Sequence, residues 1–212
     1  MIAGRQGTRS GFTLIEVMIA IGIMTVGSLG ILAMHGAVSA ANRTANEMNT
    51  ALAITERWLE RIDRDALAWS EEGINSTALG STDYLSEIAG SVADTAWFTP
   101  TPSNSTESYG FDYAGRDDPG GTNTKFCVNL RLGWLRQGSS VRVDIRTFWL
   151  REGFVHGGAT HTKWVQGNDF RGADCDAAAA DGWDLNVAGS SAPNVNVIFA
   201  STVVHWLRRD GT

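Results

Sequence analysis

The sequence predicts an α+β protein in which one long N-terminal helix packs on a C-terminal antiparallel β-sheet. Three observations predict it. An apolar stretch covers residues 12–34, a helical pattern without Gly or Pro continues to residue 69, and segments of alternating polarity follow residue 125. A helix followed by antiparallel strands is typical of the α+β class, in which the sheet buries the apolar side of the helix.

The apolar stretch at residues 12–34 is long enough to span a membrane. At about 1.5 Å per residue it forms a helix of roughly 34 Å, which exceeds a hydrocarbon core of about 30 Å. Arg5 and Arg9 precede the stretch, and no Lys or Arg follows before Arg43. The positive-inside rule therefore predicts a single-pass membrane protein with its N-terminus in the cytoplasm and the remainder outside it.

Glu16 is the only charged residue of this span. An ionised carboxylate inside a bilayer is costly without a counter-ion. A secretory signal peptide would carry a small residue after a shorter apolar core, whereas Gly11 comes before this one. Cleavage after Gly11 would keep the helix and create an amine at Phe12, and in parallel helices shifted along their axes the Glu16 of one subunit can meet the amine of the next. The plain alternative is an N-terminal anchor with an isolated glutamate.

The run GFTLIEVMIA at residues 11–20 resembles the class III signal of type IV prepilins and type II secretion pseudopilins. The resemblance implies that a prepilin peptidase removes residues 1–11 as a cytoplasmic leader and that Phe12 is then N-methylated. It also implies that Glu16 docks subunits during assembly, with other minor pilins and the major pilin as partners through the N-terminal helix. A protein of this kind is expected in the inner membrane, with its C-terminal domain in the periplasm before it enters the extracellular pilus.

Residues 35–70 are predicted to continue the helix as an amphipathic segment that packs along one seam. Steps of three and four connect the predicted buried stripe, which is Val38, Ala41, Ala45, Met48, Leu52, Thr55, Leu59, Ile62, Ala66 and Trp69. The charged residues are predicted to lie on the exposed faces; they are Glu56, Arg57, Glu60, Arg61, Arg64 and Asp65. Four glycines in the membrane part, Gly22, Gly27, Gly30 and Gly36, allow either close helix packing or local melting.

Residues 71–212 are predicted to form one periplasmic globular domain with long loops. Residues 99–124 are rich in Pro, Gly, Ser and Asp and are predicted to be a loop. Alternating segments at 126–132, 141–149 and 195–206 are predicted strands, and a Gly- and Asp-rich insertion covers 153–193. Each strand ends in Trp-Leu-Arg, which we interpret as packing against a sheet edge.

The two cysteines, Cys127 and Cys175, both lie in the part expected in the periplasm. An oxidising compartment favours a disulfide between them. Two separate buried thiols are the alternative. Because neither cysteine has a neighbouring motif for thiolate chemistry, we interpret them as structural.

Charge and motif content exclude several functions. The net charge is −6, and loss of Arg5 and Arg9 with the leader would leave 15 basic against 23 acidic residues, so no nucleic-acid partner is predicted. The four histidines are scattered, which argues against zinc. Loop acids between residues 169 and 184 could bind calcium, but solvated acids are the simpler interpretation. No nucleophile elbow or phosphate loop is present in the sequence, so we expect no enzyme, no metal and no cofactor.

Two shorter segments are similar to the minor pilins called PilV: residues 26–33 and residues 56–62. This resemblance implies a minor pilin that primes assembly, sits at or near the pilus tip and contributes to adhesion or motility. Pseudopilins of the GspI type share much of the pattern, so a minor pseudopilin of a type II secretion system is the alternative. A third hypothesis is an adhesive tip module that uses the insertion at 153–193.

Overall fold

The computed structural model describes residues 11–69, 76–150, 155–156, 159–160, 175–177 and 195–206. The chain divides into two units, residues 1–46 and residues 47–212. One helix, α1 (Leu14–Trp69), contributes to both units, which confirms the predicted helix and its end at Trp69.

In the first unit, α1 is the one helix of the described residues that is long and apolar enough to cross a membrane. Its apolar side chains are exposed along the whole segment. Gly22, Gly27, Gly30 and Gly36 are all helical, and a Cβ atom at any of them would meet nothing within 4 Å. Contacts within the chain therefore do not require glycine at these positions.

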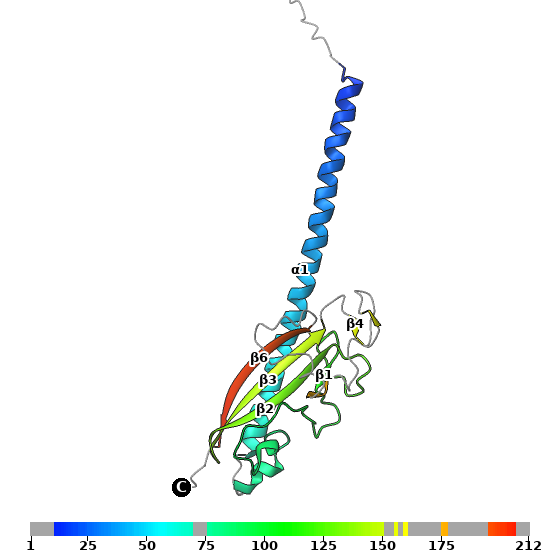
Figure 1. The fold of residues 1–212 in the computed structure, drawn as a ribbon. Coiled ribbons are helices and arrows are strands. Elements are labelled where there is room, and N and C mark those ends of the chain that lie inside the picture. The colour runs from blue at the N-terminus through cyan, green and yellow to red at the C-terminus, as the bar shows by residue number, and fades with distance from the viewer. Residues whose placement is uncertain are drawn as a thin grey trace, which may run out of the picture. The chain divides into compact units, whose positions relative to one another are not determined.

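The second unit contains a four-stranded antiparallel sheet with the strand order β1-β2-β3-β6 (Figure 1). The strands are β1 (Gly110–Phe111), β2 (Phe126–Arg136), β3 (Ser140–Leu150) and β6 (Val195–His205). Two 3-10 helices, η1 (Ser76–Ser81) and η2 (Leu85–Ile88), and a short hairpin of β4 (Val155–His156) and β5 (Ala159–Thr160) complete the described elements. The three predicted strands are confirmed, and β1 lies within the segment predicted to be only a loop.

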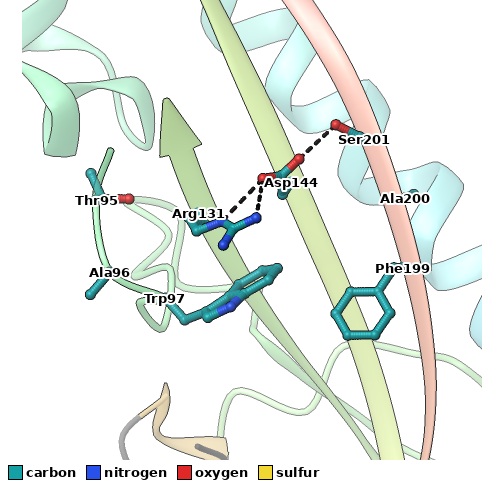
Figure 2. A pocket seen from close by; sticks show the side chains of 8 residues that line it. All are labelled: Thr95, Ala96, Trp97, Arg131, Asp144, Phe199, Ala200 and Ser201. Atoms are coloured by element: carbon teal, nitrogen blue, oxygen red, sulfur yellow. Dashed lines mark hydrogen bonds and ion pairs between the residues drawn. The ribbon is translucent and has the colours of Figure 1, made fainter. Parts of the chain in front are cut away.

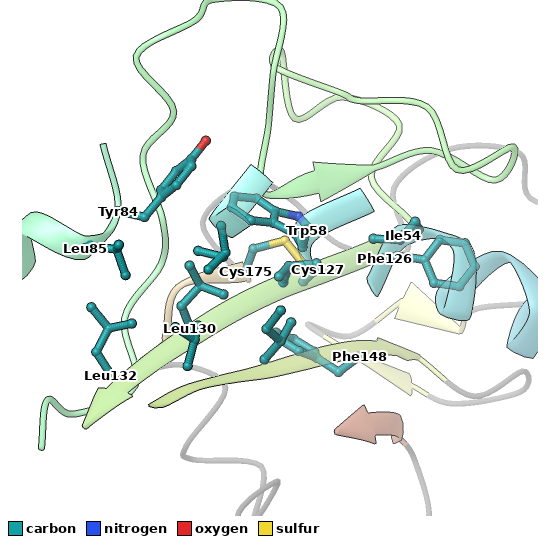
Figure 3. Close-up of a cluster of buried hydrophobic side chains, with 14 of the residues drawn as sticks. Ile54, Trp58, Tyr84, Leu85, Phe126, Cys127, Leu130, Leu132, Phe148 and Cys175 are labelled. Atoms are coloured by element: carbon teal, nitrogen blue, oxygen red, sulfur yellow. A yellow bond between two sulfur atoms is a disulfide. The ribbon is translucent and has the colours of Figure 1, made fainter. Parts of the chain in front are cut away.

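One face of the sheet and the second half of α1 share the hydrophobic core (Figure 3). Leu130 of β2 is in register with Ile145 of β3, and both are fully buried. Across the interface, the hydroxyls of Thr55 in α1 and Thr147 in β3 are 2.8 Å apart. Alternate residues of each strand point to this face because side chains in a strand alternate between the two faces of the sheet. The helix therefore packs on the sheet, as predicted.

The buried stripe of α1 differs in part from the predicted one. It comprises Ala51, Ile54, Thr55, Trp58, Arg61, Ile62, Asp65 and Trp69. Met48 and Leu52, which the pattern assigned to the core, are 51% and 44% exposed, and the predicted stripe residues Val38, Ala41 and Ala45 are exposed as well. The prediction is wrong at these positions because it followed apolar residues alone, whereas two of the buried positions carry charged side chains with partners.

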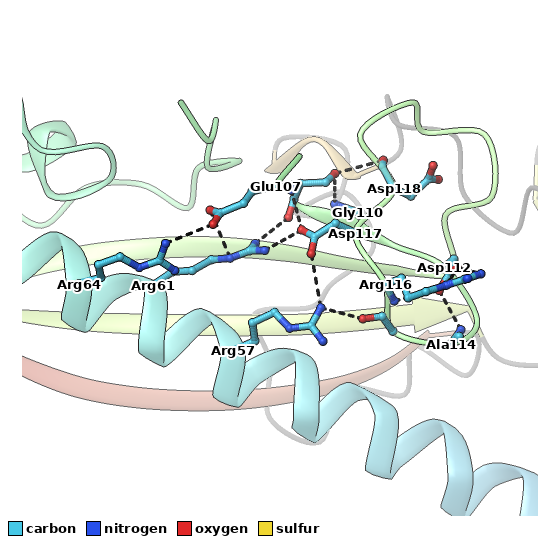
Figure 4. Close-up of polar contacts among 12 residues, drawn as sticks. Arg57, Arg61, Arg64, Glu107, Gly110, Asp112, Ala114, Arg116, Asp117 and Asp118 are labelled. Atoms are coloured by element: carbon cyan, nitrogen blue, oxygen red, sulfur yellow. Dashed lines mark hydrogen bonds and ion pairs between the residues drawn. The ribbon is translucent and has the colours of Figure 1, made fainter. Parts of the chain in front are cut away.

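Arg61 is the first of these and corrects the prediction that it lies on an exposed face. Its side chain is 4% exposed. Its Nη2 donates to Asp117 Oδ1 at 2.7 Å, its Nη1 donates to the carbonyl of Ser108 at 3.1 Å, and its Nε lies 3.4 Å from Glu107 Oε2 (Figure 4). A buried guanidinium is tolerated here because carboxylates and a carbonyl surround it.

Asp65 is the second buried charge on α1, and it also contradicts the predicted exposure. Its Oδ1 accepts the backbone N–H of Asp83 at 2.7 Å, and its Oδ2 accepts those of Tyr84 and Leu85 at 2.9 and 2.8 Å. These three amides precede and begin η2 and have no helical partner of their own. Asp65 thus ties η2 to α1.

Two tryptophans of the Trp-Leu-Arg triplets pack within the domain. The indole of Trp134 donates to the carbonyl of Ser91 at 2.9 Å, and that of Trp149 donates to Glu47 Oε2 at 3.1 Å. Packing of these two residues is confirmed, and Trp206 also packs against the core, but Trp134 and Trp149 lie at opposite ends of the β2–β3 pair and so do not cover one sheet edge. Arg151, Leu207 and Arg208 of the other triplets lie outside the described residues.

Gly115 sits where the loop after β1 contacts α1, and it has a left-handed φ of +72°. A Cβ atom there would lie 3.0 Å from Thr50 Cγ2. We expect Gly115→Ala to lower the free energy of unfolding by about 2 kcal/mol, from backbone strain together with displacement of the loop. Gly138→Ala is the matched control, because its φ is +74° but nothing lies within 4 Å. Chemical unfolding of both variants measures the difference, and equal losses would contradict a role for the Thr50 contact.

The sheet face away from α1 carries an ion-paired aspartate. Asp144 Oδ2 accepts two hydrogen bonds from Arg131, at 3.1 Å from Nε and 2.8 Å from Nη2, and Asp144 Oδ1 accepts one from the Ser201 hydroxyl at 2.7 Å. Burial raises the pKa of Asp144, but the hydrogen bonds from Ser201 and Arg131 and the charges of Arg142 and Arg131 outweigh it. The pKa of Asp144 is therefore below its ordinary value.

A depressed carboxyl pKa makes stability depend on pH in a defined direction. The contribution of Asp144 is complete above the ordinary pKa of about 3.9 and is lost as the pH falls through the lower pKa of the folded state. Asp144→Asn should therefore cost about 2 kcal/mol at pH 7 and clearly less near pH 3. Unfolding measured at both pH values tests this. Asp63→Asn, at an exposed position of α1, is the control and should change little at either pH.

Candidate processing and assembly site

Gly11, Phe12 and Thr13 form a non-helical segment directly before α1. Gly11 and Phe12 are exposed, and the peptide bond between them lies outside the helix. A peptidase can therefore reach this bond without unwinding α1. Residues 1–10 of the expected leader lie outside the described residues.

Thr13 and Glu16 cap the first turn of α1 reciprocally. Glu16 Oε2 accepts hydrogen bonds from the Thr13 backbone N–H and from the Thr13 hydroxyl, both at 3.0 Å. In return, the Glu16 N–H points to Thr13 Oγ1 at 3.4 Å and to the Thr13 carbonyl at 3.1 Å. This is the capping box, in which a Thr at the N-cap and a Glu three residues later satisfy each other's free backbone groups.

The capping box places the Glu16 carboxylate at the positive end of the helix dipole. Both of its hydrogen bonds from Thr13 use Oε2, and no hydrogen bond to Oε1 occurs among the described residues. The carboxylate is therefore oriented by its own chain and keeps one oxygen available to a further donor.

Sequence reasoning found Gly11, Phe12 and Glu16 but overlooked Thr13. The signal was present, because Thr-x-x-Glu before an apolar run is the capping-box pattern. Within the described chain, no hydrogen bond or ion pair joins Phe12 to Glu16.

Cys127 and Cys175 are joined by a disulfide, with their Cα atoms 5.3 Å apart. The disulfide connects β2 to residues 175–177, and further contacts hold this segment in place. Asn129 Nδ2 donates to the Cys175 carbonyl at 2.9 Å, and the Ala177 N–H donates to Thr99 Oγ1 at 3.0 Å. Both sulfurs are buried, so the bond links the segment to the sheet from within the core.

Metal ligands do not gather within the described residues, where no group of three His, Cys, Asp or Glu side chains is placed to hold an ion. Asp176 is described and exposed. The other acids considered for calcium, Asp169, Asp174, Asp181 and Asp184, lie outside the described residues, as does His161.

Comparison with known proteins bears on the N-terminal segment. Residues 7–32 match the model of the prokaryotic N-terminal methylation motif. No curated protein and no solved structure matches the chain. This motif is a type IV prepilin-like class III signal, the substrate signal of prepilin peptidase, and it implies assembly with other pilins. The long apolar helix and the antiparallel sheet are consistent with the pilin fold. The chain thus carries a prepilin-type signal at the start of an apolar helix, and this signal supports a protein of the type IV pilin or pseudopilin kind.

Proposed function

We propose that this chain is a minor pilin of a type IV pilus, which primes assembly and lies at or near the pilus tip. Prepilin peptidase removes residues 1–11, and Phe12 is then N-methylated. Residues 12–34 anchor the protein in the inner membrane, with the N-terminus in the cytoplasm. Residues 35–70 continue the helix, and residues 71–212 form the periplasmic domain that becomes extracellular in the pilus.

The observation that carries the proposal is the methylation motif at residues 7–32, with Glu16 in the first turn of the helix that follows. Among the described residues, the hydrogen-bond donors to the Glu16 carboxylate are two neutral groups of Thr13. The charged amine of Phe12 in a neighbouring subunit would add an ion pair where the bilayer makes an unpaired charge costly. In the assembled pilus, the carboxylate of Glu16 and the amine of a neighbouring Phe12 would then compensate each other's charge.

The role of a minor subunit, rather than of the abundant one, rests on the domain. The chain has 8 Trp and a long Gly- and Asp-rich insertion, which suit a specialised subunit. The similarity to PilV at residues 56–62 includes Trp58 and Ile62, and both are fully buried in the core. That similarity therefore supports a common packing of helix and domain.

Mass spectrometry of the native N-terminus tests the processing steps. We expect a first residue of N-methylated Phe12, and an intact Met1 would overturn the proposal. Purification from the native membrane then tests whether the protein belongs to a type IV pilus, in which case it should co-purify with pilus components. Co-purification with type II secretion components would instead indicate that the chain is a minor pseudopilin.

The proposal includes no catalytic activity. The family match is to a signal motif of structural proteins and gives no positive indication of an enzyme. The polar clusters of the described domain, one around Arg61 and one around Asp65, join α1 to loops. These contacts serve the fold.

A further inference from the structure

A cavity of about 520 Å³ lies beside β2, β3 and β6, on the sheet face away from α1 (Figure 2). Its side-chain walls include Thr95, Trp97, Arg131, Asp144, Phe199 and Ser201. Asp144 alternates along β3 with Val143 and Ile145, which are buried in the core, so it points to the opposite face. The volume falls within the range of about 300–1,000 Å³ that is usual for small-molecule sites.

Two aromatic side chains form one wall of this cavity. Trp97 and Phe199 have ring centroids 6.1 Å apart, with planes inclined by 51°. Trp97 is held in place, since the guanidinium carbons of Arg131 and Arg146 lie 4.9 and 4.5 Å from its ring centroid. Its segment is also fixed to β2, where the Phe98 N–H donates to the Leu130 carbonyl at 2.8 Å. The Trp97 side of the aromatic wall is therefore preformed.

Hydrogen-bonding groups lie beside this wall, and their charges are already compensated. Asp144 is paired with Arg131 and accepts the Ser201 hydroxyl. Arg142 Nε lies 3.2 Å from the same carboxylate. Carboxylate and hydroxyl oxygens have further lone pairs, and the 39% exposed Arg131 has N–H groups beyond those that bind Asp144. A neutral ligand can use these groups without breaking an ion pair.

We propose that this cavity is a saccharide-binding site. A sugar ring has a C–H face, which is attracted to the negative face of an aromatic ring, and an edge of hydroxyls that both donate and accept. An entirely apolar ligand would bury the Asp144 and Ser201 oxygens without adding a hydrogen bond, which is unfavourable. A strongly ionic ligand would compete with the pairing of Arg131 and Asp144. A neutral sugar ring offers its C–H face to the aromatic wall and its hydroxyls to the polar groups beside that wall.

This inference deepens the proposed function, on which it rests for the place where the saccharide is met, outside the cell. The two fail in different experiments. Binding by the purified chain does not depend on pilus assembly, and processing at Phe12 does not depend on the cavity. Failure of saccharide binding would therefore not contradict the proposed function, and failure of processing at Phe12 would not contradict the binding site.

The test uses the full chain in an amine-oxide detergent, because glycosidic detergents are themselves saccharides. The protein is screened against immobilised oligosaccharides that end in a neutral hexose or an N-acetylhexosamine, and calorimetry then measures the affinity for those retained. We expect at least one of these probes to bind. Phe199→Ala should weaken that binding roughly tenfold, because half of the aromatic wall is lost.

Val203→Ala is the matched control. Val203 and Phe199 lie on the same face of β6 and are 41% and 47% exposed, but of the two only Phe199 lines the cavity. Val203→Ala should leave the affinity unchanged. The proposal is overturned if none of the probes binds, if Phe199→Ala binds as the wild type does, or if both variants lose affinity equally.

Discussion

Glu16→Gln is expected to exclude the protein from assembled pili while leaving it in the inner membrane. Glutamine keeps an amide oxygen that can accept the hydrogen bonds from Thr13, so the cap of α1 is retained. It carries no charge, so it cannot form an ion pair with the amine of a neighbouring Phe12. We expect incorporation to fall at least about tenfold, which corresponds to about 1.4 kcal/mol of docking free energy.

The measurement is the ratio of the protein in sheared pili to the protein in membranes, by immunoblot. Glu60→Gln makes the same chemical change on an exposed position of α1 outside the predicted span and should leave the ratio unchanged. Wild-type incorporation of Glu16→Gln would show that the carboxylate charge is not needed for docking. An equal loss in both variants would point to a general requirement for negative charge on the helix.

Removal of the disulfide is expected to have the largest effect on the stability of the domain. Cys127 and Cys175 are separated by 48 positions, and closing such a loop stabilises the fold by about 4 kcal/mol in the chain-entropy model. The variant in which both are replaced by alanine should lose roughly this amount of unfolding free energy. Chemical unfolding of the full chain in detergent, followed by tryptophan fluorescence, measures it.

Reduction provides the control for this prediction. A reducing agent should destabilise the wild type by a similar amount and have no effect on the double alanine variant. A loss below about 1 kcal/mol in both experiments would contradict the chain-entropy estimate. In that case the contacts of Asn129 and Thr99 with residues 175–177 would be sufficient to hold the segment.

The long strands could be predicted because one face of the sheet is buried. Apolar residues at every second position of β2 and β3 leave a clear pattern, and the structure confirms both strands. The short β1 has no such pattern. It is held by its pairing with Cys127 and Phe126 of β2, and two residues give too little sequence to indicate a strand.

The buried charges of α1 could not be predicted from the helix alone. Arg61 pairs with Asp117, and Asp65 binds amides at residues 83–85, so the partners lie far along the chain. Without a partner, a charged residue is correctly expected at the surface. Only the folded loop buries these two positions. The buried stripe of α1 therefore differs from the stripe that its apolar residues predict.

The N-terminal site and the cavity also differ in how far the sequence predicts them. Gly11, Phe12 and Glu16 lie within six residues, and Thr13 could have been added from the same local pattern. The cavity combines Trp97 from a loop, Arg131 and Asp144 from paired strands, and Phe199 from β6. Their proximity depends on strand order and register, which the sequence pattern does not contain.

The arginines of α1 have a mechanical consequence. Arg57, Arg61 and Arg64 follow one another along the helix, and each is bound to Asp117 or Glu107 of the same loop region (Figure 4). A force along the helix axis loads these pairs in shear, side by side, together with the apolar contacts beneath them. They must then yield together rather than in succession. The buried Arg61–Asp117 pair and the more exposed pairs of Arg57 and Arg64 therefore share any load that pulls the domain from its helix.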